Sequence, residues 1–550
     1  MTVVGRVLGT EDAQPLDFWV GIQEGSYLQL DDVVTVATEL PDRTQVRLFG
    51  IVDQVRSRYE GAKFDSDVFR VAEGILPVGV STAAHVSATR IEPEVLIPPR
   101  PGQEVSRANA DERDIALYFD QMTRKFPAGL SRDGQIIYGN LDFLDGTKGA
   151  HINISGISGV ATKTSYALFL LYGLFHSESL GTAAANTHAL VFNVKGEDLL
   201  WLDKPNAHLS DEHRDKYTAL GLPAKPFASV GLWAPVRRGD QTIPDTGGRQ
   251  EDVTGYYWSL REFCSDRLLS FMFAEADNEL SQIEFVIRLV ERWLEQLERS
   301  QKHDNPWLDF DGERFESFSD LVVYIVDHID LIAGSAAVGT QHAFARRLEN
   351  AAMAMGHLIR SERKKDAEKH KINWQAKQVS VIDIHNLPDR AKRFVVGVIM
   401  KKLMEEKERI GRKDPLVFLV LDELNKYAPR EGWSPIKEVV LDIAERGRSL
   451  GVVLMGAQQT ASEIERRVVA NASFRVVGRL DAGEAQRAEY GYLTAPARAR
   501  AALLKPGNMF FQQPEVPVPL LVQFPFPAWA TRADEVAEPN DGKPPRGFKS

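Results

Sequence analysis

Lys163 and Thr164 stand where a predicted strand gives way to a predicted helix. Residues 151–155 favour a strand, residues 156–162 are small and flexible, and an apolar run of helix formers begins at Ser165. A loop that leads into a helix N-terminus can bind phosphate through its backbone N–H groups, with a lysine on the outer phosphates and a hydroxyl on Mg²⁺. The stretch therefore predicts a nucleoside-triphosphate site.

The glycine spacing of this loop departs from the regular pattern. A regular phosphate loop has glycine immediately before the lysine and another glycine six residues before it. Here those positions hold Thr162 and Ile157. An ordinary helix start is the competing interpretation, and the second half of the chain has to decide between the two. The residues expected to bind the phosphates are Gly156, Ser158, Gly159, Val160, Ala161, Thr162, Lys163, Thr164 and Ser165.

Two carboxylates close a second predicted strand. The apolar residues 416–421 lead directly into Asp422 and Glu423. An aspartate in this place can hold Mg²⁺ together with Thr164, and an adjacent glutamate can polarise the water that attacks the γ-phosphate. Carboxylates that cap a buried strand have few structural roles. This stretch favours the nucleotide interpretation.

Further polar residues follow in an order that fits the same chemistry. A predicted helix ends with Arg446 and Arg448, and the next strand closes with Gln458 and Gln459. An arginine on a helix edge can reach the γ-phosphate of a neighbouring subunit, and a glutamine at a strand end can sense that phosphate. A solvated surface is the alternative for the arginines. Asn193, Lys195, Glu197 and Asp198 follow another apolar strand and could line the site or form a solvated turn.

The elements that carry these residues predict an α/β fold with several domains. Short alternating segments in residues 1–97 indicate a small β-barrel or sandwich, and the proline-rich residues 97–105 indicate a linker. Residues 106–254 and 372–530 alternate strands and helices, and residues 255–371 have helical periodicity typical of an insertion. Residues 531–550, rich in charge and proline, are expected to be disordered.

Composition limits the remaining possibilities. The chain has 550 residues, a formal charge of −11 and one cysteine, Cys264. The acidic balance excludes a surface that is basic throughout, so any nucleic-acid contact is left to a local patch or channel. A single cysteine excludes an internal disulfide and fits a reducing cytoplasm, with a buried thiol as the expected state. The sequence contains no signal-peptide pattern and no apolar run of membrane-spanning length, so we expect a soluble cytoplasmic protein.

The order of these segments resembles the HerA family of hexameric translocases, relatives of FtsK and the conjugative coupling ATPases. The N-terminal GRVLG and the strands after it are similar to that family's HAS barrel, LVLDELNKYAP to its Walker B segment, ERGRSLGVVLMGAQQTASEI to its arginine-finger helix and sensor strand, and LLKPGNMFF to its C-terminal strand. The resemblance spans nearly the whole chain.

This resemblance implies a RecA-like P-loop NTPase core, a homo-hexamer, ATP and Mg²⁺ between subunits, and double-stranded DNA in the bore. It assigns Lys163 to the phosphates, Thr164 and Asp422 to Mg²⁺, and Glu423 to the water. Gln459 would be the sensor, Arg448 the finger that acts on the next subunit, and Arg446 the second choice for that role.

Two functions remain in view from the sequence. The first is an ATPase motor on duplex DNA that works with a NurA-like nuclease or, in antiphage defence, with another effector such as a sirtuin-like NAD hydrolase. The second is a ring-shaped assembly platform in which nucleotide is structural and a partner enzyme is arrayed and activated. ATP hydrolysis with and without duplex DNA separates them.

Overall fold

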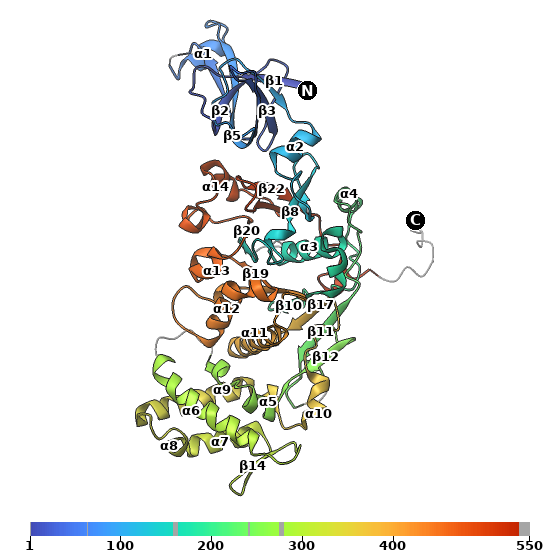
Figure 1. Ribbon diagram of the computed structural model, residues 1–550, viewed down its shortest axis with the longest axis vertical. Coiled ribbons are helices and arrows are strands. Elements are labelled where there is room, and N and C mark those ends of the chain that lie inside the picture. Colours follow the sequence, from blue (N-terminus) through green and yellow to red (C-terminus); the bar gives the residue numbers. More distant parts are fainter. Residues whose placement is uncertain (1, 63, 158–162, 240–242, 274–279, 538–550) are drawn as a thin grey trace, which may run out of the picture. The chain divides into compact units, whose positions relative to one another are not determined.

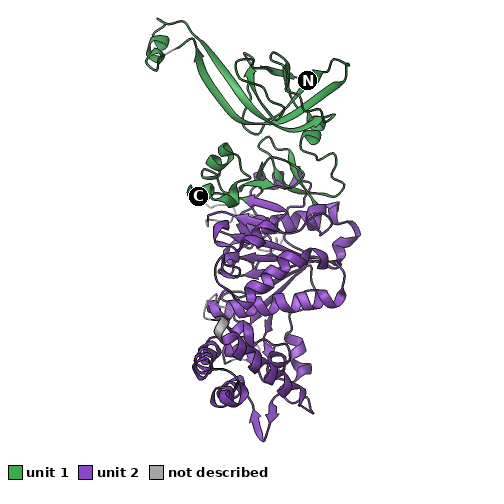
Figure 2. Ribbon diagram, turned by 60° about the vertical axis from the view of Figure 1, so that its left-hand side comes forward, with its two compact units in different colours: residues 1–140, 477–523 green, residues 141–476, 524–550 purple. Residues whose placement is uncertain are grey.

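The structure, a computed structural model, describes residues 2–62, 64–157, 163–239, 243–273 and 280–537. The chain forms two compact units, coloured separately in Figure 2. We call residues 1–140 with 477–523 the barrel unit, and residues 141–476 with 524–550 the sheet unit. Each unit is built from segments that are distant in the sequence, so neither corresponds to one continuous stretch of chain.

The barrel unit contains a closed six-stranded barrel in the order β1-β2-β5-β4-β3-β6. Its strands are β1 (Thr2–Val7), β2 (Asp17–Ile22), β3 (Val33–Glu39), β4 (Gln45–Glu60), β5 (Gly79–Glu92) and β6 (Glu104–Arg107). Alternate apolar residues fill the interior, among them Phe18, Val34 and Val86. β4 and β5 extend beyond the barrel as a two-stranded arm that carries α1 (Asp67–Ala72) (Figure 2).

Two antiparallel hairpins complete the barrel unit. They are β7 (Lys125–Leu130) with β8 (Ile136–Asn140), and β21 (Asn508–Gln512) with β22 (Leu520–Gln523). The unit also contains α2 (Ala110–Ala116) and α14 (Ala495–Ala501). Arg500 on α14 forms a two-pronged ion pair with Asp31 at 2.8 and 2.9 Å, so the C-terminal segment is tied to the loop before β3.

The sheet unit is organised around seven parallel strands in the order β12-β11-β17-β10-β18-β19-β9, with β20 beyond β9 (Figure 1). They are β9 (Ile152–Ser155), β10 (Thr187–Asn193), β11 (Val230–Pro235), β12 (Val253–Tyr256), β17 (Val379–Asp383), β18 (Leu416–Asp422), β19 (Val452–Gln458) and β20 (Phe474–Val477). Residues of β10, β18 and β19 are almost entirely buried. Strands covered on both faces read as continuous apolar runs, which is why the sequence reveals them.

Helices connect these strands. α3 (Lys163–His176) lies between β9 and β10 in the sequence, α11 (Asp389–Ile410) follows β17, and α12 (Pro435–Leu450) follows β18; α4 (Asp211–Ala219) and α13 (Arg466–Ala470) are shorter. α3 is buried along nearly all its length, which fits its continuous apolar sequence. Ser434 caps α12 by accepting from the Lys437 N–H, and Pro435 begins the helix.

The helical insertion lies between β12 and β17 in the sequence. It contains α5 (Leu260–Ser265), α6 (Leu280–Arg299), α7 (Phe318–Asp327), α8 (Ile329–Ile332), α9 (Val338–Met355) and α10 (Lys364–Ala367), with short pairs β13 (Trp258–Ser259) with β16 (Ile359–Arg360) and β14 (Leu308–Phe310) with β15 (Glu313–Phe315). One hydrophobic cluster joins it to the parallel sheet, running from Leu419 through Val396 to Phe344. Cys264 is fully buried there, and burial raises the pKa of its thiol.

The predicted fold class is confirmed: a RecA-like α/β core of parallel strands carries an N-terminal barrel and a helical insertion. Two details differ from expectation. The barrel does not end at residue 97, because β6 closes it after the proline-rich turn. The sequence also predicts a helix over residues 110–126; in the structure α2 ends at Ala116, and Lys125–Leu130 forms β7. Among the described residues, none of the helices has the length and apolar character to cross a bilayer.

The tail predicted to be disordered begins within ordered chain. Residues 531–537 pack within the sheet unit. The Glu535 carbonyl accepts from the Ala207 N–H at 2.7 Å, and the Ala537 N–H donates to the Pro205 carbonyl at 3.0 Å. Backbone hydrogen bonds hold this segment in spite of its charge-rich composition. Residues 538–550 lie outside the described part of the chain.

Candidate functional site

The carboxyl ends of the parallel strands bring polar residues into a row. Ser155 at the end of β9 aligns with Gln458 of β19, and Asp422 of β18 aligns with Ala457. Asn193 of β10 aligns with Asp383 of β17. Ligands of open parallel sheets bind at this edge, so these strand ends define the candidate site.

Lys163 and Thr164 meet the Asp422 carboxylate at this edge. Thr164 Oγ1 donates to Asp422 Oδ2 at 3.3 Å. The Lys163 side chain is buried, and its Nζ donates to the Gly156 carbonyl at 2.9 Å. Burial lowers the pKa of the Lys163 ammonium, against the attraction of Asp422. A buried lysine held by a loop carbonyl is placed to take up an anion.

Glu423 has an unusual backbone and two lysine partners. Its φ of 56° and ψ of 42° lie in the left-handed region, and its N–H donates to Asp422 Oδ1 at 2.8 Å. Lys195 Nζ lies 2.9 Å from Glu423 Oε1, and Lys426 Nζ lies 2.8 Å from Glu423 Oε2. Backbone strain of this kind concentrates at functional sites, and here it turns the carboxylate toward both lysines.

The charges around Glu423 set its protonation. Burial would raise the pKa of the Glu423 carboxyl, but hydrogen bonds from Lys426 and Lys195 outweigh it, and the pKa lies below its ordinary value. Burial likewise opposes the charge on Lys195, while the hydrogen bond to Glu423 and the charge of Asp422 hold the Lys195 pKa above its ordinary value. Glu423 and Lys195 are therefore both charged at neutral pH.

A cavity of about 330 Å³ opens beside these groups. Its lining includes the apolar residues Phe192, Leu199 and Phe526 and the charged residues Arg532 and Glu535. The polar groups that line it include Lys163, Thr164, Ser165, Asn193, Lys195, Asp198 and Asp422. Asn193, Lys195 and Asp198 of the polar cluster after β10 therefore line the candidate site. Among the described residues that line the cavity, Glu197 is absent.

The donor set fits Mg²⁺. Thr164 and Asp422 present a hydroxyl and a carboxylate oxygen to each other. Mg²⁺ takes oxygen ligands and is commonly held by one or two protein groups, with water and substrate phosphates in the other positions. The described residues contain no group of three or more His, Cys, Asp or Glu side chains arranged to hold a metal by themselves.

The loop residues between Gly156 and Lys163 are only partly described. Ser158, Gly159, Val160, Ala161 and Thr162 lie outside the described residues, so their expected phosphate contacts stay predictions. Gly156 is buried, and its N–H donates to the Gln458 carbonyl at 3.1 Å. The start of the loop is thus fixed against β19.

Two adjacent glutamines stand at the end of β19, and their side chains lie in different surroundings. Gln458 is fully buried, and its Nε2 donates to Asn153 Oδ1 at 2.7 Å and to Ser155 Oγ at 2.8 Å. Gln459, the predicted sensor, is exposed just beyond the strand. Gln458 therefore ties β19 to β9, and Gln459 is the one of the two that faces solvent.

The structure does not bring Arg446 or Arg448 to Lys163. α12 runs from the carboxyl edge of the sheet back to the start of β19, so both arginines lie at the amino edge. Arg448 is exposed and donates from Nη2 to the Thr147 carbonyl at 3.0 Å and from Nε to the Gly146 carbonyl at 3.2 Å. Arg446 pairs with Asp442 at 3.0 Å and also with Glu408. Neither arginine can serve the nucleotide site of its own chain.

Sequence reasoning missed two features of the site edge. Lys426 reaches Glu423 from the 3₁₀ turn after β18, three residues further on. Asp383 accepts from Asn193 Nδ2 at 2.8 Å and pairs with His385 Nδ1 at 2.8 Å. A strand ending in Asp-x-His, in line with Asn193, was the available signal for the second feature.

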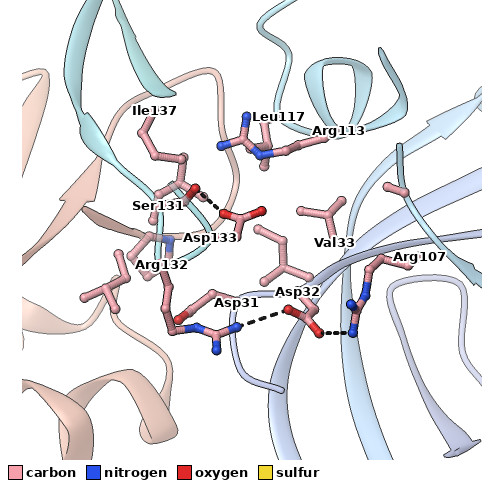
Figure 3. Close-up of a pocket in the computed structure, with 15 residues that line it drawn as sticks. Asp31, Asp32, Val33, Arg107, Arg113, Leu117, Ser131, Arg132, Asp133 and Ile137 are labelled. Atoms are coloured by element: carbon pink, nitrogen blue, oxygen red, sulfur yellow. Dashed lines mark hydrogen bonds and ion pairs between the residues drawn. The ribbon is translucent and has the colours of Figure 1, made fainter. Parts of the chain in front are cut away.

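The barrel unit has a separate pocket, of about 80 Å³, drawn in Figure 3. Its lining includes Asp31, Asp32 and Asp133 together with Arg107, Arg113 and Arg132. Asp32 accepts from Arg107 and from Arg132, each at 3.1 Å (Figure 3). Asp31 pairs instead with Arg500, and Asp133 accepts from Ser131. The pocket is a structural ion network of the barrel unit.

Comparisons with known proteins give distant likenesses only. No protein-family profile matches the sequence, and no curated protein matches it. The structure is similar to VirB4 of Thermoanaerobacter pseudethanolicus, with 14% identity, a TM-score of 0.43, and coverage of 72% of this chain and 96% of that one. It is similar to the plasmid coupling protein TrwB in complex with ADP and Mg²⁺, with 11% identity, a TM-score of 0.46, and coverage of 76% and 98%.

A third similar structure is the genome packaging NTPase B204 from Sulfolobus turreted icosahedral virus 2 in complex with AMP. The identity is 15% and the TM-score 0.22, and the match covers 27% of this chain and 68% of that one.

Proposed function

We propose that this protein is a ring-forming ATPase of the HerA type that hydrolyses ATP to move on duplex DNA. The observation that carries the proposal is the convergence of Lys163, Thr164 and Asp422 at one cavity, from two segments of the chain. Glu423 follows Asp422 directly and is bound by Lys195, which lines the same cavity. An ammonium, a hydroxyl and two carboxylates at the carboxyl edge of a parallel sheet are the groups that ATP hydrolysis requires.

Each group has a separate task in this proposal. Lys163 leaves the Gly156 carbonyl and donates to the outer phosphates, while Thr164 and Asp422 hold Mg²⁺. When bound, Mg²⁺ neutralises phosphate charge. Glu423 accepts a hydrogen bond from the attacking water and orients it toward the terminal phosphorus. The depressed pKa keeps Glu423 ionised and therefore able to accept that hydrogen bond.

The position of Arg448 supports a ring. Charge develops on the phosphates as the bond to the leaving group breaks, and an arginine from elsewhere can stabilise it. Arg448 is exposed at the edge of the sheet opposite to the site of its own chain. A head-to-tail arrangement of copies would bring Arg448 of one to the cavity of the next, and such interfaces close into rings. We take six copies from the resemblance to the HerA family.

Duplex DNA and a companion effector also enter from that resemblance. The formal charge of −11 leaves a basic bore as the place for DNA. VirB4, a plasmid coupling protein and a genome packaging NTPase are among the proteins of similar structure. An antiphage role, with a nuclease or a sirtuin-like NAD hydrolase as the effector, is the setting that we propose.

Steady-state ATP hydrolysis with and without duplex DNA tests this function. We expect measurable hydrolysis that DNA stimulates, and loss of that hydrolysis in Glu423→Gln. A matched single-stranded oligonucleotide measures the preference for duplex. If the intact chain hydrolyses no ATP either with or without duplex DNA, the proposed motor function is wrong.

The alternative is a nucleotide-stabilised assembly platform that arrays and activates a partner enzyme. It is favoured by the state of Glu423, whose two oxygens are both held by lysines. The atypical glycine spacing of the loop points the same way. Assembly on ATP addition without turnover, measured by light scattering and phosphate release on one sample, would select this alternative.

A further inference from the structure

Lys195 links the cavity to Glu423. It follows β10, which pairs directly with β18, the strand that ends in Asp422. The Lys195 side chain is 47% exposed, and its Nζ lies 2.9 Å from Glu423 Oε1 and 3.8 Å from Asp422 Oδ2. Lys195 also lines the same cavity as Lys163 and Thr164. A single ammonium therefore faces both the proposed phosphate position and the carboxylate that would orient water.

The two lysines on Glu423 are not equivalent. Lys426 occupies Oε2 and also lies 4.0 Å from Asp389. Among the described residues, the cavity lining includes Lys195 and does not include Lys426. An anion that enters the cavity can thus compete for Lys195 while leaving the Lys426 contact in place.

The local charge favours such an exchange. Three ammonium groups, from Lys163, Lys195 and Lys426, surround the two carboxylates of Asp422 and Glu423. Asp389 lies 4.0 Å from Lys426 and offsets that ammonium, so the ammonium groups on the cavity lining itself are those of Lys163 and Lys195. A phosphate oxygen makes charge-assisted hydrogen bonds with lysine at least as strong as a carboxylate does. The half-exposed Lys195 can turn toward it at lower cost than the buried Lys163.

We propose that Lys195 distinguishes ATP from ADP and couples that distinction to Glu423. Without a terminal phosphate, Lys195 holds Glu423 Oε1 and keeps it from water. With ATP in the cavity, Lys195 turns to the terminal phosphate and releases that oxygen. This inference rests on the proposed nucleotide site and adds to it the residue that reports the third phosphate.

Isothermal titration of the full-length protein with ADP and with a non-hydrolysable ATP analogue, both with Mg²⁺, tests the proposal. For Lys195→Met we expect the affinity for the analogue to fall about tenfold relative to ADP, because one charge-assisted contact is lost. Lys195→Arg should restore at least half of the preference. The measured quantity is the ratio of the two dissociation constants, which a purely structural role would leave unchanged.

Lys426→Met is the matched control. This substitution also removes one lysine ammonium that contacts the Glu423 carboxylate. We expect the ratio of the two dissociation constants for this variant to equal that of the wild type. An equal fall of the ratio in both variants would overturn the role of Lys195, as would an unchanged ratio in Lys195→Met. If the wild type binds neither nucleotide, the proposed function itself fails, and this inference with it.

Discussion

Thr164 Oγ1 lies 3.3 Å from Asp422 Oδ2, although 258 positions separate the two residues in the sequence. The contact spans β19, which lies between β9 and β18 in the sheet. A hydroxyl at the start of α3 and a carboxylate at the end of β18 therefore face each other only when all three strands are in register. This relationship makes the site sensitive to each of its parts, and five predictions follow from the geometry around it.

Replacing Lys163 with alanine removes the buried ammonium beside the Gly156 carbonyl. We expect ATP affinity to fall at least tenfold, because charge-assisted contacts to phosphate are lost. Nucleotide titration measures the change. Lys216→Ala, which removes a surface ion pair with Glu212 on α4, serves as the control and should bind ATP as the wild type does. Equal affinity in Lys163→Ala and the control would contradict the assignment.

Glu423→Gln keeps the shape of the side chain and removes its charge. We expect ATP to bind while hydrolysis falls by at least ~100-fold, because the attacking water loses a negatively charged acceptor and has only a weakly basic amide oxygen in its place. Single-turnover quench experiments measure hydrolysis, and analysis of the nucleotide retained after gel filtration measures trapping. Rapid hydrolysis by this variant would exclude Glu423 from the chemistry.

Arg448→Ala should abolish turnover without dissolving the assembly. An arginine that neutralises transition-state charge contributes on the order of 10³-fold to the rate. Mixing Arg448→Ala with Lys163→Ala chains should restore part of the activity, since some interfaces then pair an intact lysine with an intact arginine. Arg446→Ala is the control, because Arg446 already pairs with Asp442 and Glu408. Mixtures that stay inactive at every ratio would count against action between subunits.

Gly146→Ala should displace Arg448. Gly146 has a φ of +88°, and a Cβ there would lie 2.5 Å from the Arg448 carbonyl oxygen. We expect a loss of about 1–3 kcal/mol in stability and a lower rate of hydrolysis. Gly134→Ala is a matched control: Gly134 has a φ of +80°, but a Cβ there meets no atom within 4 Å. Thermal unfolding and hydrolysis of the two variants separate the cost of the close approach from that of the backbone angle.

Lys426→Met should alter stability in a pH-dependent way. Lys195, Lys426, Asp422 and, beyond Lys426, Asp389 are charged groups around Glu423. Because the folded pKa of Glu423 lies below its ordinary value of 4.5, the lysine contacts stabilise the fold above that pH. The stabilisation is lost as pH falls through the folded value.

The variant should therefore be less stable than the wild type at pH 7, and the difference should shrink below pH 4.5. Lys426 is 38% exposed, so solvent screening limits the difference at pH 7 to about 1 kcal/mol or less. Chemical denaturation of the variant and the wild type, at pH 7 and at a pH below 4.5, measures this difference in the free energy of unfolding. A difference that grows toward acid would mean that Glu423 is not stabilised by this lysine.

The two carboxylates at the end of β18 could be predicted because the strand before them is buried. Residues 416–421 form an apolar run that is followed directly by two carboxylates. This pattern can be recognised in the sequence without knowing which strands lie beside it. The same holds for the lysine and threonine that begin α3. Burial and a sharp change to polar residues were sufficient signals.

The remaining details depend on register and backbone conformation, which single-sequence patterns do not fix. Gln458 and Gln459 are adjacent, and a shift of one residue decides which faces β9 and which faces solvent. Lys426 reaches Glu423 because of the left-handed backbone at Glu423, which no sequence pattern marks. β6 has only four residues and follows a proline-rich turn, so it resembled part of the linker.

The chain passes between the barrel unit and the sheet unit at three places, after residues 140, 476 and 523. A force applied to the barrel unit would be carried by three covalent connections, and cleavage of any one of them would leave the two units joined. Neither unit can therefore be isolated by trimming the chain at a single point.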